Sequence, residues 1–223
     1  MVIRVDGRTS QDLVYGSSTQ RFDVPLAQGS HYLGIRFRPG QSRHFLKVAA
    51  VELTNTFESA QELCKFDLYG MPELVEGHGV FAKLNAILEK FIQIHPPIHS
   101  RIDNAILDIE LSNGIVSIAE TAAIYGKSVR QFERVFRETV GVSPKLFSEI
   151  TRFHRASMLI TSGTLSLVQV AADMGYTDQS HMSREFRRFT NLPPISYMRS
   201  DVAFLQDLFH KLDDNCVSQL IFI

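Results

Sequence analysis

The feature that most constrains the fold is an internal repeat in the C-terminal half of the chain: residues 117–147 resemble residues 166–197. Some positions recur after 49 residues and others after 50. Ile118, Ala122 and Gly126 match Leu167, Ala171 and Gly175, whereas Arg134, Phe136, Arg137, Pro144 and Phe147 match Arg184, Phe186, Arg187, Pro194 and Tyr197. A turn that is one residue longer in the second copy explains the change of offset. Each copy therefore predicts a helix, a Gly-containing turn and a second helix, which is a helix-turn-helix unit.

The second helix of each copy, expected at 128–139 and 178–189, has two distinct faces. At about 100° per residue, Phe132 and Phe136 share one face, while Met182, Phe186 and Phe189 form the matching stripe in the second copy. Arginine side chains lie on the opposite faces. The planar guanidinium donates two parallel hydrogen bonds to guanine or binds a phosphate, so these faces predict DNA contact.

The candidate DNA contacts fall into two groups according to their position along each helix. Residues near the helix starts are expected to touch bases, and residues before or beyond them to touch phosphates, which fix the register without reading sequence. The candidate base contacts are Arg130, Gln131, Arg134, Gln179, Ser180 and Arg184, and the candidate phosphate contacts are Ser128, Arg137, Arg187 and Arg188. His181 lies beside the second helix, where DNA contact and packing are equally compatible with the pattern.

A single long helix is expected to join the two copies. Ser143 and Pro144 provide an N-cap and a proline at the first helical position, and the pattern continues to about Thr161. About 18 residues at 1.5 Å each give a length of about 27 Å, against about 34 Å between successive major-groove segments. One chain could thus read two consecutive segments.

Through the stretches GKSVRQFERVFRETVGVSP (126–144) and DMGYTDQSHMSREFRRFTNLPP (173–194), residues 112–200 resemble the DNA-binding domain of the AraC/XylS family of bacterial transcription regulators. It implies sequence-specific binding to double-stranded promoter DNA through helices 128–139 and 178–189, with RNA polymerase as a further candidate partner. Asn191 stands where the family usually has Gly; asparagine tolerates the left-handed conformation, so the turn is expected to survive.

The first 70 or so residues are typical of strands and turns, with short runs at Ile3–Val5, Leu33–Phe37 and Phe45–Val51. The segment GIRFRPG (34–40) resembles cupin-like sensor domains of such regulators. About 70 residues are fewer than a full sensor has, so the resemblance implies a shortened or truncated sensor, with a small-molecule effector as a candidate ligand.

Two further helical segments complete the expected organisation. The connector 76–111 carries apolar stripes that either form a homodimer interface or pack on the sensor, and helix 201–213 has an apolar stripe of its own. The predicted fold class is α+β, with a β-rich cupin-like N-terminal part and an all-α C-terminal domain. The expected domains are residues 1–75, 76–111 and 112–200, followed by a C-terminal helix and tail at 201–223.

Charge is distributed unevenly along the chain. The formal net charge is −1, yet residues 112–200 hold 11 Lys or Arg against 7 Asp or Glu, and the remainder holds 12 against 17. A basic segment within a neutral chain fits one part that meets phosphate. No apolar run approaches the roughly 20 residues that cross a bilayer, so a cytoplasmic protein is expected, at the nucleoid when bound to DNA.

No pattern of catalytic or metal-binding residues stands out. Cys64 and Cys216 are far apart, and Pro96-Pro97 interrupts the spacing between His95 and His99. We therefore expect no enzyme activity, no cofactor and no metal. Two alternatives stay open from the sequence: a small-molecule-binding cupin-like protein or enzyme whose helical half is a scaffold, and a helix-turn-helix fold used for protein contact.

Overall fold

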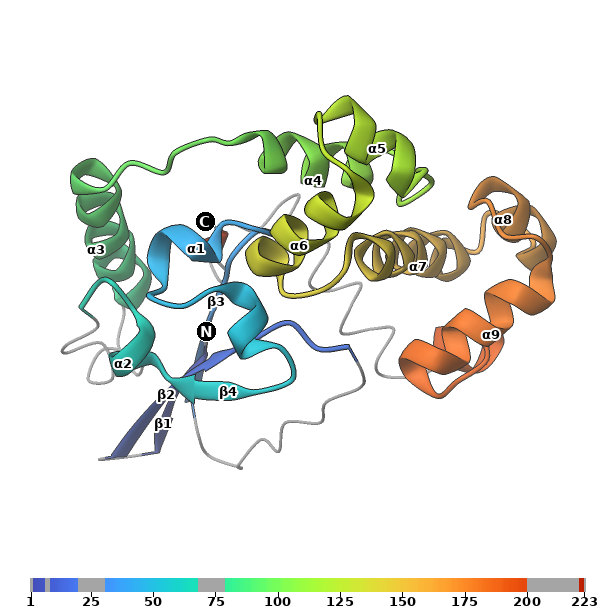
Figure 1. Cartoon of the computed structure of the whole chain (residues 1–223). Coiled ribbons are helices and arrows are strands. Elements are labelled where there is room, and N and C mark those ends of the chain that lie inside the picture. Colours follow the sequence, from blue (N-terminus) through green and yellow to red (C-terminus); the bar gives the residue numbers. More distant parts are fainter. Residues whose placement is uncertain (1, 7–8, 20–30, 68–78, 200–220, 223) are drawn as a thin grey trace. The chain divides into compact units, whose positions relative to one another are not determined.

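The computed structural model of the chain describes residues 2–6, 9–19, 31–67, 79–199 and 221–222 (Figure 1). The chain divides into two compact units. One, here called the sheet unit, comprises Met1–Ser100, Phe136–Val142 and Cys216–Ile223; the other, the helical unit, comprises Arg101–Val135 and Ser143–Asn215. The helix expected at 201–213 lies outside the described residues.

The sheet unit is built on a small, largely antiparallel sheet in the strand order β4-β2-β1-β3-β5. β1 pairs antiparallel with both β2 and β3, β2 pairs antiparallel with β4, and β3 pairs parallel with β5. The strand bounds are Val2–Asp6 for β1, Thr9–Tyr15 for β2, His31–Arg36 for β3, Phe57–Ser59 for β4 and Ile221–Phe222 for β5. The described chain is thus mostly helical with a small sheet, and the cupin-like assignment stays a prediction.

One expected strand, Phe45–Val51, is wrong. This run contains the end of α1 (Ser42–Phe45), an isolated bridge between Leu46 and Cys64, and the start of the 3₁₀ helix Ala50–Leu53. The backbone N–H of Ala49 donates to Glu52 Oε1 at 2.9 Å, which supports the 3₁₀ turn. Phe45 and Leu46 are buried from these turns rather than from a pleated strand, because core packing overrides strand propensity here.

Helix α3 (Val80–Ile94) packs into the core of the sheet unit. Its Leu84, Leu88 and Phe91 belong to the same buried cluster as Phe45 of α1 and Ala60 of α2 (Ala60–Leu63). The apolar stripe of α3 is therefore used by packing within its own unit, which was one of the two interpretations of the connector.

Helix α4 (Arg101–Leu111) belongs to the helical unit and buries Ala105, Ile106 and Ile109. The connector expected at 76–111 is accordingly divided between the units, with α3 in one and α4 in the other. The remaining domain limits and the homodimer stay predictions.

The repeat produces two similar helix-turn-helix units around a long helix. The first repeat contains α5 and α6 and the second α8 and α9; α7 joins them, and α10 follows (Figure 1). The bounds are Ile118–Ile124 for α5, Val129–Val140 for α6, Pro144–Ser162 for α7, Leu167–Asp173 for α8, Gln179–Thr190 for α9 and Pro194–Met198 for α10. The one-residue change of offset falls in the turns, residues 125–128 against 174–178, as the sequence predicts.

Matching residues begin and end the helices of both repeats. Ser117 and Ser166 cap α5 and α8 through side-chain hydroxyls that accept backbone N–H groups. Gly126 and Gly175 follow these helices with φ of 64° and 68°, the left-handed conformation that glycine adopts most easily. Asn191 ends α9 at φ 62°, so the expectation that asparagine can replace glycine there is confirmed.

The second repeat has a well-defined aromatic core. Phe153 of α7 lies 4.8 Å from Phe186 and 5.2 Å from Phe189 of α9, measured between ring centroids. Tyr197 of α10 packs edge-on against Phe186 at 5.6 Å. These rings fix α9 and α10 against α7 as one packed layer.

Candidate nucleic-acid interface

The second helix of each repeat, α6 in the first and α9 in the second, is here called its recognition helix. At the start of α6, Ser128 and Gln131 cap the helix reciprocally. Ser128 N–H donates to Gln131 Oε1 at 3.2 Å, and Gln131 N–H donates to Ser128 Oγ at 3.4 Å. Both side chains are exposed, yet both already serve the helix start. The sequence assigned Ser128 to phosphate and Gln131 to bases; either contact would have to exchange one of these bonds.

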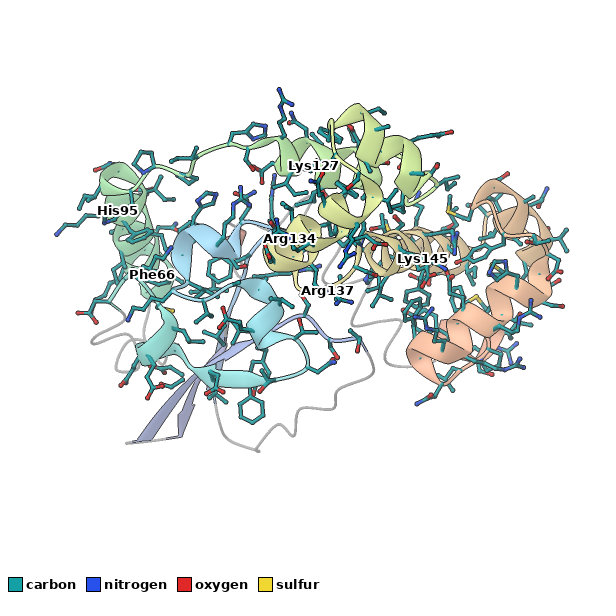
Figure 2. All side chains as sticks on the ribbon, in the orientation of Figure 1. Phe66, His95, Lys127, Arg134, Arg137 and Lys145 are labelled. Carbon is teal, nitrogen blue, oxygen red and sulfur yellow. The ribbon has the colours of Figure 1, made fainter. Side chains whose placement is uncertain are left out.

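The exposed face of α6 is basic and its opposite face is apolar. Phe132 and Phe136 are fully buried, whereas Arg130, Arg134 and Arg137 are exposed. Figure 2 shows Arg134 and Arg137 along α6, with Lys127 in the preceding turn and Lys145 near the start of α7. The structure thus presents the three predicted arginines on one helix face, and it adds Lys145 as an exposed cation that the sequence assignment left out.

The second recognition helix, α9, begins at Asp178, whose carboxylate accepts the N–H of His181 at 2.6 Å. A carboxylate at this end also interacts favourably with the helix dipole. The four predicted contacts Gln179, Ser180, Arg184 and Arg187 are all exposed on α9. These side chains are thus accessible to a ligand.

His181 packs rather than reaching outward. Its ring lies edge-on to that of Tyr176, with the centroids 5.4 Å apart, and the N–H of Thr177 points at its Nδ1 at 3.5 Å. Of the two interpretations left open by the sequence, this geometry favours packing.

Arg188, predicted to contact phosphate, has partners within the protein. Its guanidinium donates to Glu149 Oε2 of α7 at 2.7 Å and lies 5.2 Å from the centroid of the Phe189 ring. The side chain is 55% exposed, so this ion pair is weak and solvent-screened. A phosphate could compete with Glu149 for Arg188, and the assignment stays a prediction.

A buried polar cluster that the sequence analysis missed lies behind α9. Glu185 accepts two bonds, from Arg152 Nη2 of α7 at 2.6 Å and from the Tyr176 hydroxyl at 2.5 Å. The guanidinium carbon of Arg152 also lies 4.6 Å from the centroid of the Tyr176 ring. A sequence signal existed: Glu185 falls between Met182 and Phe189 on the apolar stripe of α9, where a carboxylate needs a partner.

The environment of this cluster fixes its protonation. Burial raises the pKa of the Tyr176 hydroxyl, and the hydrogen bond to Glu185 raises it further, so Tyr176 remains a neutral donor. Burial lowers the pKa of Arg152, but the hydrogen bond and charge of Glu185 more than offset this, and the net shift is upward. Arg152 therefore keeps its charge and Tyr176 keeps its proton.

The first repeat has a different tyrosine link. Tyr125, in the turn after α5, donates to Asp108 Oδ2 of α4 at 2.5 Å. Burial, followed by the hydrogen bond to Asp108, raises the pKa of Tyr125 to about 12. This bond joins the turn after α5 to α4, and neither of its two residues belongs to α6.

Groups that would hold a metal are not found in the part of the chain that the structure describes: it contains no set of three or more His, Cys, Asp or Glu placed to do so. Nor does any described helix have the length and apolar character needed to cross a membrane.

Two sequence profiles match the chain in separate regions. One, described as a helix-turn-helix domain, covers residues 121–200, and the other, a domain of unknown function (DUF6597), covers residues 1–59. The first match contains both recognition helices. The fold and the exposed arginine faces thus define a helix-turn-helix DNA-binding domain.

The chain is similar in sequence to known regulators. The arabinose operon regulatory protein of Escherichia coli (strain K12) is 26% identical over 160 residues, covering 66% of this chain and 55% of its own. That of Salmonella typhimurium (strain LT2) is 27% identical over 135 residues, covering 55% and 48%. A crystal structure of an AraC-type regulator from Chromobacterium violaceum is 27% identical and covers 43% of this chain and 86% of its own, with a TM-score of 0.40.

The chain thus contains a helix-turn-helix domain at residues 121–200 and is similar to regulators of the AraC type. The chain spans about half the length of these two curated relatives. The alternative in which the helical half is only a scaffold is not favoured.

Proposed function

We propose that this protein is a sequence-specific, DNA-binding transcription regulator that reads two consecutive major-groove segments with α6 and α9. The observation that carries the proposal is the repeated arginine face. Arg134 and Arg184 occupy matching positions on two recognition helices, both exposed and both opposite a buried phenylalanine stripe. Arginine at such positions binds guanine edges or phosphates.

The length of α7 supports simultaneous reading by one chain. Its 19 residues correspond to about 28 Å at 1.5 Å per residue. This is close to the spacing of about 34 Å between major-groove segments on one side of B-DNA.

The other parts of the proposal extend to the N-terminal half. We propose a cupin-like sensor for a small-molecule effector in this half, supported by the small, largely antiparallel sheet. RNA polymerase and a second copy of the chain are the further partners proposed. The relatives are regulators, which supports a protein without enzyme activity; the cytoplasmic location is part of the same proposal.

The direct test is a gel-shift series with a random duplex pool, followed by titration of the selected duplex at increasing salt. We expect selection of a defined sequence and a fall in affinity of about 0.9 log units per log unit of salt for each phosphate contact. Absence of any selected sequence, at all salt concentrations, would contradict the proposal.

Base reading by α9 can be tested with Arg184→Ala. The variant should lose about 1–3 kcal/mol of discrimination at one base pair. Lys90→Ala, which removes the same charge from exposed α3, is the control and should leave base discrimination intact. Equal weakening of Arg184→Ala on every duplex would instead assign Arg184 to phosphate.

A further inference from the structure

We infer that Glu185, held by Arg152 and Tyr176, sets the rotation of α9 about its own axis and so determines how sharply the second recognition helix reads bases. None of these three residues belongs to the exposed arginine face. The inference rests on the proposed function, because it concerns the precision of DNA reading by α9.

The cluster joins three separate elements. Arg152 comes from α7, Tyr176 from the turn between α8 and α9, and Glu185 from the middle of α9. Each carboxylate oxygen of Glu185 has its own donor: Oε2 accepts from Arg152 and Oε1 from Tyr176. The side chains of Arg152 and Glu185 are 17% and 6% exposed, so water competes little for these bonds. Glu185 is therefore held from two directions.

Directional bonds restrict rotation more than apolar packing does. A side-chain group about 5 Å from the helix axis moves by about 2 Å when the helix turns by 20°. Such a shift breaks hydrogen bonds, whose useful range of donor–acceptor distance is about 0.5 Å. The contacts of the buried Met182 side chain are non-directional and tolerate more movement.

Rotation of α9 bears directly on Arg184, the residue next to Glu185 in the chain. A bidentate arginine–guanine contact needs both the distance and the plane of the guanidinium to be right. Sites of this kind work when they are held within about 0.5 Å and 10–20°. A carboxylate adjacent in sequence and fixed on the buried side is well placed to supply that constraint.

The first repeat provides an internal comparison. Val135 stands at the position of Glu185 in α6, and Lys127 at the position of Tyr176. No carboxylate on α6 can therefore take this role at that position. The cluster of Glu185, Arg152 and Tyr176 therefore has no equivalent at the matching positions of the first repeat.

The test uses the full chain and the duplex that the wild-type protein selects from a random pool, with single base changes introduced into each half of the site. The variants are Glu185→Gln, which keeps the shape but loses the charge, and Tyr176→Phe, which removes one hydroxyl. Glu89→Gln on exposed α3 makes the same change of net charge outside both recognition helices and is the matched control.

Both variants are expected to lose about tenfold in discrimination between correct and altered bases in the half-site read by α9. Discrimination in the other half-site, the salt dependence and the helix content should stay as in the wild type. Glu89→Gln should keep discrimination in both half-sites. Tyr176→Phe keeps the Arg152–Glu185 pair and so provides a folded protein if Glu185→Gln is too unstable.

Unchanged discrimination in folded variants, with a lower unfolding midpoint alone, would overturn the inference and leave the cluster a structural one. Equal loss in both half-sites would overturn it as well. Failure of the wild-type protein to select any sequence would contradict the proposed function itself, which is a separate and recognisable result.

Discussion

The two repeats share a framework but hold their recognition helices differently. At the C-terminal end of α6, the hydroxyl of Ser17 donates to the carbonyl of Val140 at 2.8 Å and that of Thr54 to the carbonyl of Gly141 at 2.7 Å. These bonds come from residues 123 and 87 positions away in the chain. The end of α6 is completed by distant residues of the sheet unit.

The end of α9 is completed locally. Thr190 Oγ1 donates to the carbonyl of Phe186 at 2.7 Å and accepts the N–H of Leu192 at 3.1 Å. Asn191, in the left-handed conformation, donates its N–H to the carbonyl of Arg187 at 2.9 Å. No distant segment is needed for these bonds.

The helices that precede the two repeats, α4 and α7, carry opposite charges at matching positions. Asp103 of α4 stands 11 residues before Gly114, and Arg152 of α7 stands 11 residues before Gly163, so a buried acid matches a largely buried base. Two repeats with the same order of helices and turns thus hold their recognition helices through different side-chain bonds. The last turn of α6, which belongs to the sheet unit, is bonded by Ser17 and Thr54 of that unit, whereas α9 is held by Arg152 of α7.

The largest loss of stability is expected from a substitution at Gly114, the glycine that follows α4. Gly114 has φ +73°, and a Cβ there would lie 2.1 Å from the carbonyl oxygen of Ser148. Gly114→Ala should lower the free energy of unfolding by about 4 kcal/mol, through backbone strain and overpacking against α7. Urea denaturation of the full chain measures this.

The matching glycine of the second repeat is the control. Gly163 has φ +66°, but a Cβ added there would meet no atom within 4 Å. Gly163→Ala should therefore cost only about 1 kcal/mol, the penalty for the left-handed backbone. Similar losses in the two variants would show that α4 and α7 do not approach each other closely at Gly114.

A smaller loss of stability is expected when Glu185 is replaced by valine, the residue at the matching position 135 of the first repeat. Glu185→Val leaves the largely buried Arg152 without its carboxylate, and should cost about 3 kcal/mol. The double variant with Arg152→Met should recover most of that loss, because apolar residues can replace a buried pair without penalty. Urea denaturation of the two variants decides; a double variant as unstable as the single one would mean that the pair is not an isolated unit.

Most of the helical fold could be predicted because its signals are local. Ser117, Ser166 and Asp178 cap helices next to them, and Gly126, Gly175 and Asn191 end turns through their own backbone preferences. The repeat doubles each signal, and the exposed positions of Arg134 and Arg184 follow from helical periodicity alone.

The features that escaped prediction depend on residues far apart in the sequence. Glu185 lies on an apolar stripe, but nothing local identifies Arg152, 33 positions away, as its partner. Ser17 and Val140 are farther apart still. Phe45–Val51 has the composition of a strand, yet burial of Phe45 and Leu46 in the sheet-unit core decides its local structure.

The smallest effect tests how the two recognition helices end. Thr54→Val and Thr190→Val each remove one hydroxyl of nearly the same shape, so each should cost about 1 kcal/mol, the value of one hydrogen bond. Amide hydrogen exchange should show that the two variants lose protection in different helices. Thr54→Val should reduce protection in the last turn of α6 and leave α9 unchanged, and Thr190→Val should do the reverse. Loss of protection in α6 from both variants would mean that the two ends are coupled, and that the second recognition helix is not supported by its own unit alone.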